Sequence, residues 1–291
     1  MPFSRLTAAG EWWNANVVDV ENEALATGAA PNNSDAYTIN GRPGDLYPCS
    51  RNGTYKLTVV QGKTYLLRII NAALNNQLFF KIARHNFTVV AVDASYTEPY
   101  KADVVVISPG QTTDVLLTGR PTSGGLLHTC SRVCECASAA GVPFDNTTTT
   151  EIVHYKDSTS ASPEMPVLPA FNDTPTAHKF YSNLTSLTRK AMPDVDERMF
   201  ITVGLGLTAC DRNTTCAGPS GLKLAASMNN QSFQLPSRLS AAGILFGGEW
   251  YLHRGFPRQP SGGVRLHNPN KQFQCVALLD GEEHTCEEIK I

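Results

Sequence analysis

The sequence predicts an all-β fold of the sandwich or barrel type, and two observations carry this prediction. Between residues 54 and 118, apolar and polar residues alternate in short runs rich in Val, Ile, Thr, Phe and Tyr, which is the period-two pattern of half-buried strands. Turn-forming pairs such as Asn75-Asn76 and Pro109-Gly110 separate the runs. Several short strands at this spacing are typical of a sandwich or a barrel, and no helical period of comparable strength is visible.

The strands are predicted in chain order from this alternation. The first two strands form a hairpin around Gln61-Gly62-Lys63, and four more follow, so that the predicted strands cover residues 54–60, 64–70, 78–83, 87–92, 104–108 and 114–118. Residues 156–175 are rich in Ser, Thr, Pro and Asp, a composition that predicts an exposed connector because proline disfavours both helix and central strand. Residues 199–205 and 228–235 then predict the opening of a further β-domain.

Composition places the chain among soluble globular proteins. It has 291 residues, 42% of them hydrophobic and 17% charged, enough to bury one large core or two modest ones. A formal net charge of -2 provides no broad basic surface, so nucleic acid is excluded as a partner. No apolar run approaches the roughly 18 residues that span a bilayer, so no membrane association is expected. The first residues lack the apolar core of about 7–15 residues of a signal peptide, so no export signal is visible.

The interior nevertheless has the character of a secreted protein, because Asn-x-Ser/Thr acceptors for N-linked glycans are frequent. We predict acceptors in polar, turn-like sequence at Asn32, Asn52, Asn146, Asn172, Asn183, Asn213 and Asn230. A further acceptor sequence begins at Asn86 and runs into the predicted strand at 87–92, so it is the least suitable of the set. Chance occurrence is the alternative, since Ser and Thr are abundant throughout the chain.

Two cysteines are close enough in sequence to form a local disulfide. Cys210 and Cys216 flank a five-residue loop, a spacing that permits a disulfide in an oxidising compartment. Two reduced, buried thiols are the alternative.

Long segments of the chain resemble plant laccases, which are multicopper oxidases. Their second cupredoxin domain is similar to GEWWNANVVDVENEAL (residues 10–25), GKTYLLRIINAALNNQLFFKIA (62–83), FTVVAVDASYTEPY (87–100) and VVVISPGQTTDVLLT (104–118). The entry into their third domain is similar to VGLGLTACDRNTTCAGPSGLKLAASMNNQSFQLP (203–236). The resemblance implies a cupredoxin-like Greek-key β-sandwich, the middle laccase domain, followed by a partial second β-domain and a poorly defined C-terminal tail.

The resemblance also sets the expected boundaries. Residues 1–9 are an atypical N-terminus, 10–157 the second cupredoxin-like domain with an atypical stretch at 124–136, and 158–198 a connector. Residues 199–240 are a partial third cupredoxin-like domain, and 241–291 an atypical tail of non-native sequence. The abrupt loss and recovery of resemblance around 124–136 is what an out-of-frame stretch or a misplaced splice junction would produce.

The family activity implied by the resemblance is oxidation of phenols, including those of lignin, with reduction of dioxygen to water in the apoplast of the plant. Copper is the family's cofactor, held by His-Trp-His-Gly, a second His-x-His, His-Pro-x-His-x-His-Gly and His-Cys-His motifs, since clustered imidazoles and a thiolate suit copper. None of the seven histidines here lies in a His-x-His sequence. We therefore predict no catalytic, cofactor-binding or metal-binding residue, no bound copper, and no activity of this chain by itself.

An alternative metal site and two alternative functions are also compatible with the sequence. His128, Cys130, Cys134 and Cys136 could together hold zinc or Cu(I), but they lack the Cys-x-x-Cys pairs of common structural sites. The alternative functions are a non-catalytic interaction or decoy protein that associates with intact laccases, and a pseudogene product.

Several conspicuous residues are expected to be structural. Surface or strand-end positions are predicted for His85, His154 and His178, and turn or hydrogen-bonding roles for Asp93, Asp103 and Asp114. Trp12 and Trp13 are predicted to fill the sandwich core rather than to line a phenol pocket.

Overall fold

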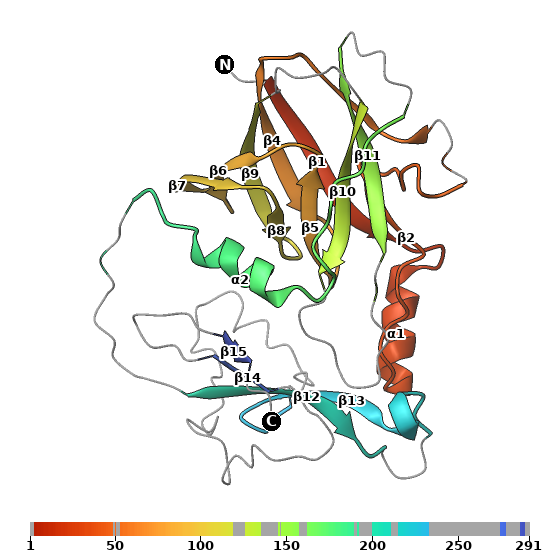
Figure 1. Cartoon of the computed structure of the whole chain (residues 1–291). Coiled ribbons are helices and arrows are strands. Elements are labelled where there is room, and N and C mark those ends of the chain that lie inside the picture. The colour runs from red at the N-terminus through yellow and green to blue at the C-terminus, as the bar shows by residue number, and fades with distance from the viewer. Residues whose placement is uncertain are drawn as a thin grey trace, which may run out of the picture. The chain divides into compact units, whose positions relative to one another are not determined.

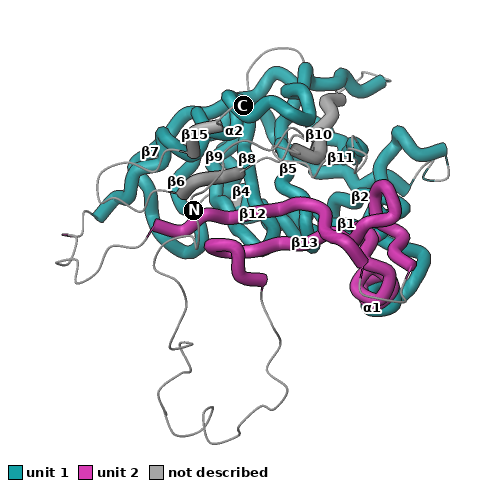
Figure 2. The backbone as a smooth tube through the Cα atoms, turned by 90° about the horizontal axis from the view of Figure 1, so that it is seen from below, with its two compact units in different colours: residues 1–19, 32–137, 144–190 teal, residues 20–31, 138–143, 191–291 magenta. Residues whose placement is uncertain are grey.

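The computed structural model describes residues 3–48, 50, 53–118, 126–134, 145, 147–156, 162–188, 191, 200–210, 215–232, 274–277 and 286–288. The chain divides into two compact units (Figure 2): unit 1 comprises residues 1–19, 32–137 and 144–190, and unit 2 comprises residues 20–31, 138–143 and 191–291. In the described part of the chain, no helix is long and apolar enough to cross a membrane.

Unit 1 is built from two β-sheets with a shared core (Figure 1). The first sheet has the strand order β2 (Ala36–Ile39), β1 (Phe3–Trp12), β4 (Thr64–Asn71), β9 (Thr112–Thr118), β6 (Phe87–Val92) and β7 (Ser95–Ala102). The second sheet has the order β3 (Lys56–Val59), β11 (Thr148–Tyr155), β10 (Leu126–Cys134), β5 (Gln77–Ile82) and β8 (Val105–Ile107). Neighbouring strands are antiparallel except for the parallel pairs β1–β4 and β3–β11.

The alternating sequence pattern explains which residues are buried. In β4, Tyr65, Leu67 and Ile69 are buried in the core while the residues between them are partly or fully exposed. In β5, Leu78, Phe79, Phe80 and Ile82 are all fully buried. Each fully buried side chain of this size contributes about 1.5–3 kcal/mol of hydrophobic free energy. The predicted all-β sandwich follows from this burial.

A connector is expected at residues 158–198, and in the structure the part of this range that contains helix α2 belongs to unit 1. Helix α2 (Thr174–Ser182) begins after Asp173, whose carboxylate accepts a hydrogen bond from the Thr176 amide at 3.1 Å. Its residues Ala177 and Phe180 belong to the core, at 4% and 2% exposure. Prolines that limit a helix interior are compatible with its first turn, where Pro175 lies.

Two stretches that were expected to be atypical of the family occupy strand positions. Residues 3–9, expected to be an atypical N-terminus, form most of β1 and pair in parallel with β4. The atypical stretch 124–136 contains β10, which pairs with both β5 and β11 near the middle of the second sheet. Pairing between strands uses backbone groups, so a strand position tolerates a change of side chains better than a binding site does.

Unit 2 contains the third sheet, with the order β13 (Lys223–Met228), β12 (Ile201–Thr208), β14 (Gln274–Ala277) and β15 (Cys286–Glu288). Helix α1 (Val17–Thr27) contributes its residues from 20 onward to this unit. Hydrogen bonds join the end of α1 to later residues of the same unit. The Ala217 amide donates to the Thr27 carbonyl at 3.0 Å, and the Leu224 amide donates to the Gly28 carbonyl at 2.8 Å. A 3-10 turn, η2 (Pro219–Gly221), precedes β13. Residues 20–31 thus belong to the same compact unit as residues 191–291.

Candidate functional site

The histidine expected at a strand end, His85, is a buried structural residue. It lies between β5 and β6 with 3% of its surface exposed. Its Nδ1 atom is 2.7 Å from the Ala83 carbonyl oxygen and its Nε2 atom is 2.6 Å from the Tyr155 hydroxyl. Because a carbonyl only accepts, Nδ1 carries a proton and donates, and in the neutral ring Nε2 accepts from Tyr155. Both ring nitrogens are thus used in hydrogen bonds that hold the core together, and neither offers a lone pair to a metal.

The other histidines with described side chains come from separate elements. His154 is half-buried on β11, and His178 is exposed on α2, with its Nε2 atom 3.4 Å from the Ser182 hydroxyl. Within the described residues, no three His, Cys, Asp or Glu side chains are arranged to hold a metal ion. The described donor set therefore does not fit copper, which needs several converging imidazole nitrogens and a thiolate.

The cysteines in the described part of the chain fall into three groups. Cys210 and Cys216 form a disulfide with Cα atoms 6.0 Å apart. The register places Cys130 opposite Thr150, and Cys134 opposite Gln77, along β10. Cys275 and Cys286 lie on β14 and β15. Of the four residues considered as zinc or Cu(I) ligands, Cys136 lies outside the described residues, as do Cys49, His253, His267 and His284.

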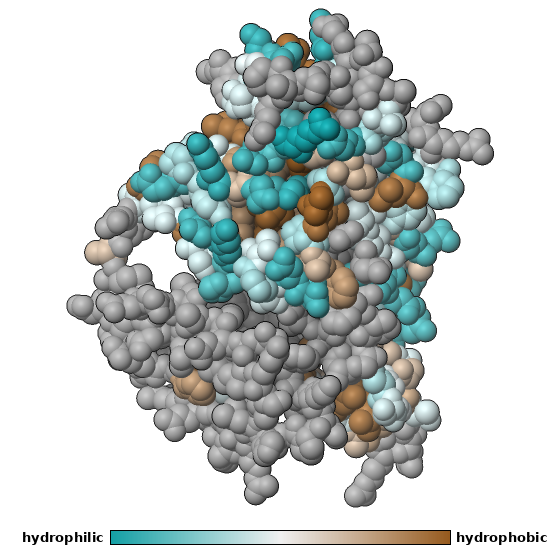
Figure 3. Space-filling view, viewed as in Figure 1, coloured by the Kyte–Doolittle hydropathy of each residue, from teal (hydrophilic) through white to brown (hydrophobic). Residues whose placement is uncertain are grey.

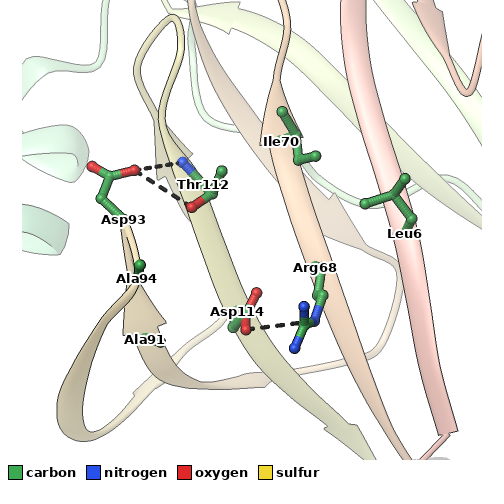
Figure 4. A pocket seen from close by; sticks show the side chains of 8 residues that line it. All are labelled: Leu6, Arg68, Ile70, Ala91, Asp93, Ala94, Thr112 and Asp114. Carbon is green, nitrogen blue, oxygen red and sulfur yellow. Dashed lines mark hydrogen bonds and ion pairs between the residues drawn. The ribbon is translucent and has the colours of Figure 1, made fainter.

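A shallow depression of about 260 Å³ lies on the outer face of the first sheet (Figure 4). Strands β1, β4, β6 and β9 and the β6–β7 turn supply its lining residues, which are Leu6, Arg68, Ile70, Ala91, Asp93, Ala94, Thr112 and Asp114. The Arg68 guanidinium lies 3.8 Å from the Asp114 carboxylate, and Asp93 accepts a hydrogen bond from the Thr112 amide at 2.7 Å. The lining contains no histidine or cysteine, so it provides none of the imidazole or thiolate ligands that suit copper.

The three aspartates have the predicted structural roles. Asp93 and Asp114 bond to neighbouring strands as described, and Asp103 pairs with Lys81 at 2.7 Å. The hydrogen bond from Lys81 lowers the pKa of the Asp103 carboxyl below its usual value of 3.8.

A buried polar cluster at one end of β1 was missed by sequence reasoning. Tyr37, 1% exposed, donates to a carboxylate oxygen of Glu11 at 2.7 Å, and Asn76 donates to the same oxygen at 3.0 Å. The other carboxylate oxygen of Glu11 accepts from the Leu74 amide at 2.7 Å. Burial, followed by the hydrogen bond to Glu11, raises the pKa of the Tyr37 phenol well above 10. These contacts link three segments that are distant in sequence, so only the fold brings them together.

The tryptophan prediction is wrong for Trp12. Its side chain is 52% exposed, because it lies at an even-numbered position of β1, on the face turned away from the core. Trp13 is half-buried beyond the strand end and donates through its indole nitrogen to the Asn32 carbonyl at 3.1 Å.

Four predicted glycan acceptors have described side chains, and all four are exposed: Asn32, Asn172, Asn183 and Asn230. Asn183 caps the end of α2 and donates through Nδ2 to the Lys179 carbonyl at 2.7 Å. Asn52, Asn146 and Asn213 lie outside the described residues.

Comparison with known proteins places this sandwich in a family. A family model described as "Multicopper oxidase" matches residues 4–158, more than half of the 291-residue chain. The chain belongs to the multicopper oxidase family. It is similar to plant laccases: it is 50% identical to Laccase-7 of Arabidopsis thaliana, over 96% of this chain and 50% of that protein. Laccase-12 of Arabidopsis thaliana is 52% identical, over 79% of this chain and 41% of that protein. The chain spans about half the length of these relatives.

Solved multicopper oxidases share the fold. Fet3p aligns with a TM-score of 0.60 at 20% identity, over 80% of this chain and 40% of that one. A mutant of the laccase from B. aclada aligns with a TM-score of 0.55 at 19% identity, again over 80% and 40%. At these identities the likeness concerns the fold, and it confirms the predicted all-β, cupredoxin-like class.

The comparison with Laccase-7 bears on residues 241–291, which were expected to lack resemblance to the family. Its alignment covers 96% of the chain, so it continues into residues 241–291, where sequence reasoning found no resemblance.

Proposed function

We propose that this chain is a scaffold portion of a laccase-type multicopper oxidase and that it does not oxidise phenols by itself. The family chemistry couples one-electron oxidation of phenols, including lignin-type phenols, to reduction of dioxygen to water at copper. In this proposal, the copper ligands are supplied from outside residues 1–291. We assign the polypeptide to the apoplast, as an exported glycoprotein, because the plant laccase relatives imply that compartment.

The observation that supports inactivity is the use of the histidine nitrogens. The sequence contains no His-x-His, and both ring nitrogens of the buried His85 form hydrogen bonds, one with the Ala83 carbonyl and one with the Tyr155 hydroxyl. A copper ion at His85 would have to displace the Tyr155 hydroxyl from Nε2, and the loss of that hydrogen bond costs about 0.5–1.5 kcal/mol.

A copper and turnover measurement tests this proposal. The purified full chain is incubated with Cu(II), desalted, and analysed for copper by mass spectrometry and for dioxygen uptake with 2,6-dimethoxyphenol; an intact plant laccase treated in parallel is the control. We expect copper well below one per chain and no phenol-dependent uptake. Stoichiometric copper with turnover would overturn the proposal.

The second candidate function is non-catalytic association with intact laccases, and exposed apolar side chains on unit 1 favour it. Leu6, Trp12 and Leu74 are 55%, 52% and 65% exposed. Figure 3 shows hydrophobic residues interspersed with hydrophilic ones on the described part of one face. Apolar side chains at a surface can mark a binding site. Size-exclusion chromatography with light scattering on a mixture with intact laccase tests this idea, and elution of two separate monomers would contradict it.

A further inference from the structure

The strongest unassigned feature is the connection between β5 and β6, where the chain passes from the second sheet to the first (Figure 1). Residues 83–86 form this connection, and their exposure alternates sharply. Ala83 and His85 are 1% and 3% exposed, whereas Arg84 and Asn86 are exposed. Asn86 therefore follows the turn formed by residues 82–85 and lies immediately before β6 begins at Phe87.

Two buried anchors display Asn86 at the surface. On one side, His85 is held by its two ring hydrogen bonds and by its own amide, which donates to the Ile82 carbonyl at 3.2 Å. On the other side, Phe87 is fully buried, with its ring centroid 5.9 Å from that of Phe80. Since both neighbours are fixed in the core, the side chain between them is directed outward.

The exposed amide of Asn86 begins an acceptor sequence. Thr88 follows at the second position after it, with Phe87 and not proline between them, as N-linked glycosylation requires. Asn183, in contrast, donates through its amide to a backbone carbonyl of its own helix. No hydrogen bond to the Asn86 side chain occurs among the described residues, so a sugar attached there displaces none of their hydrogen bonds.

We propose that Asn86 carries an N-linked glycan when the chain is exported, an inference that rests on the proposed secretion. In the reaction, Nδ2 of Asn86 forms a bond to the anomeric carbon of a lipid-linked oligosaccharide diphosphate. The bond from that carbon to the phosphate oxygen breaks, one amide proton is lost, and the lipid diphosphate leaves. The glycan root is then fixed at the rim of the sandwich by the anchors on both sides.

Matched variants at Thr88 provide the test, because Thr88 is half-buried on β6 and serine keeps its hydroxyl. The full chain is expressed in plant cells behind a cleavable secretion signal. The purified protein is deglycosylated by peptide amidase in ¹⁸O-water, and each acceptor peptide is analysed by mass spectrometry. We expect labelled aspartate at position 86 in the wild-type chain and in Thr88→Ser, and unlabelled asparagine in Thr88→Ala.

Labelling of the other acceptors distinguishes failure of the Asn86 proposal from failure of the proposed secretion. If Asn32 or Asn183 is labelled while Asn86 is not, the proposal for Asn86 is overturned and the proposed secretion stands. If no acceptor is labelled, both are overturned. Asn86→Gln serves as a second variant, and it is expected to remove one glycan step in gel mobility without changing the label at the other acceptors.

Discussion

Replacing His85 with alanine tests whether this residue is a structural link between the β5–β6 connection and β11. The substitution removes two hydrogen bonds, to the Ala83 carbonyl and to the Tyr155 hydroxyl. Each contributes about 0.5–1.5 kcal/mol net, and a buried partner left without its bond adds about 1–3 kcal/mol. The ring is also stacked on Tyr155, with centroids 6.0 Å apart. We expect the free energy of unfolding to fall by about 2–4 kcal/mol.

A double-mutant cycle isolates the contact. Tyr155→Phe removes only the hydroxyl and is expected to cost about 1 kcal/mol. In the His85→Ala background, the hydroxyl has already lost its bond to His85, so the same change should be neutral or stabilising, giving a coupling energy of at least about 1 kcal/mol. Urea denaturation followed by circular dichroism provides the four free energies. Added Cu(II) should leave the difference between wild type and His85→Ala unchanged. Additive effects, or a copper-dependent stabilisation that requires His85, would refute the reasoning.

Three further predictions concern the scaffold. Gly44→Ala should destabilise the protein by about 3 kcal/mol, because the φ of Gly44 is +84° and a Cβ there would collide with the backbone of β11. Gly41→Ala is the control: its φ is +74° but its Cβ would meet open space, so it should cost about 1 kcal/mol. Equal losses of stability for the two variants in thermal denaturation would contradict this difference. Because the pKa of Asp103 is lowered, its pairing stabilises the fold above about pH 4 and is lost as pH falls through the folded pKa. Lys81→Met should therefore reduce the loss of stability on acidification by at most about 1 kcal/mol, since the Asp103 side chain is 63% exposed; an unchanged acid profile would be the contrary result. Tyr37 should remain protonated in alkaline solution until the protein unfolds, since its pKa is raised. Tyr37→Phe should therefore leave the absorbance titration at 295 nm unchanged below the pH of unfolding. A smaller absorbance change in the variant over that pH range would contradict the burial argument.

The alternation of apolar and polar residues predicted β3, β4, β5, β6, β8 and β9 of the sandwich, but not β1, β2, β7, β10 or β11. The predicted strands at 64–70 and 87–92 correspond to β4 (Thr64–Asn71) and β6 (Phe87–Val92). Alternation is a local property, because one face of each strand packs on the core whatever its partners are. The Asp173 cap and Pro175 were also readable as the start of α2, but the polar composition of the surrounding segment obscured them.

The sequence determined the family, the all-β class and the absence of any His-x-His motif, since each of these is carried by residues that are near one another in the chain. Tertiary structure alone decided which polar residues are buried. Sequence could not show that Glu11 meets Tyr37 and Asn76, or that His85 meets Tyr155. It also could not show that Asn86 lies at the surface between two buried neighbours. Burial and hydrogen bonding of these side chains depend on long-range pairing of the sheets, which no local pattern encodes.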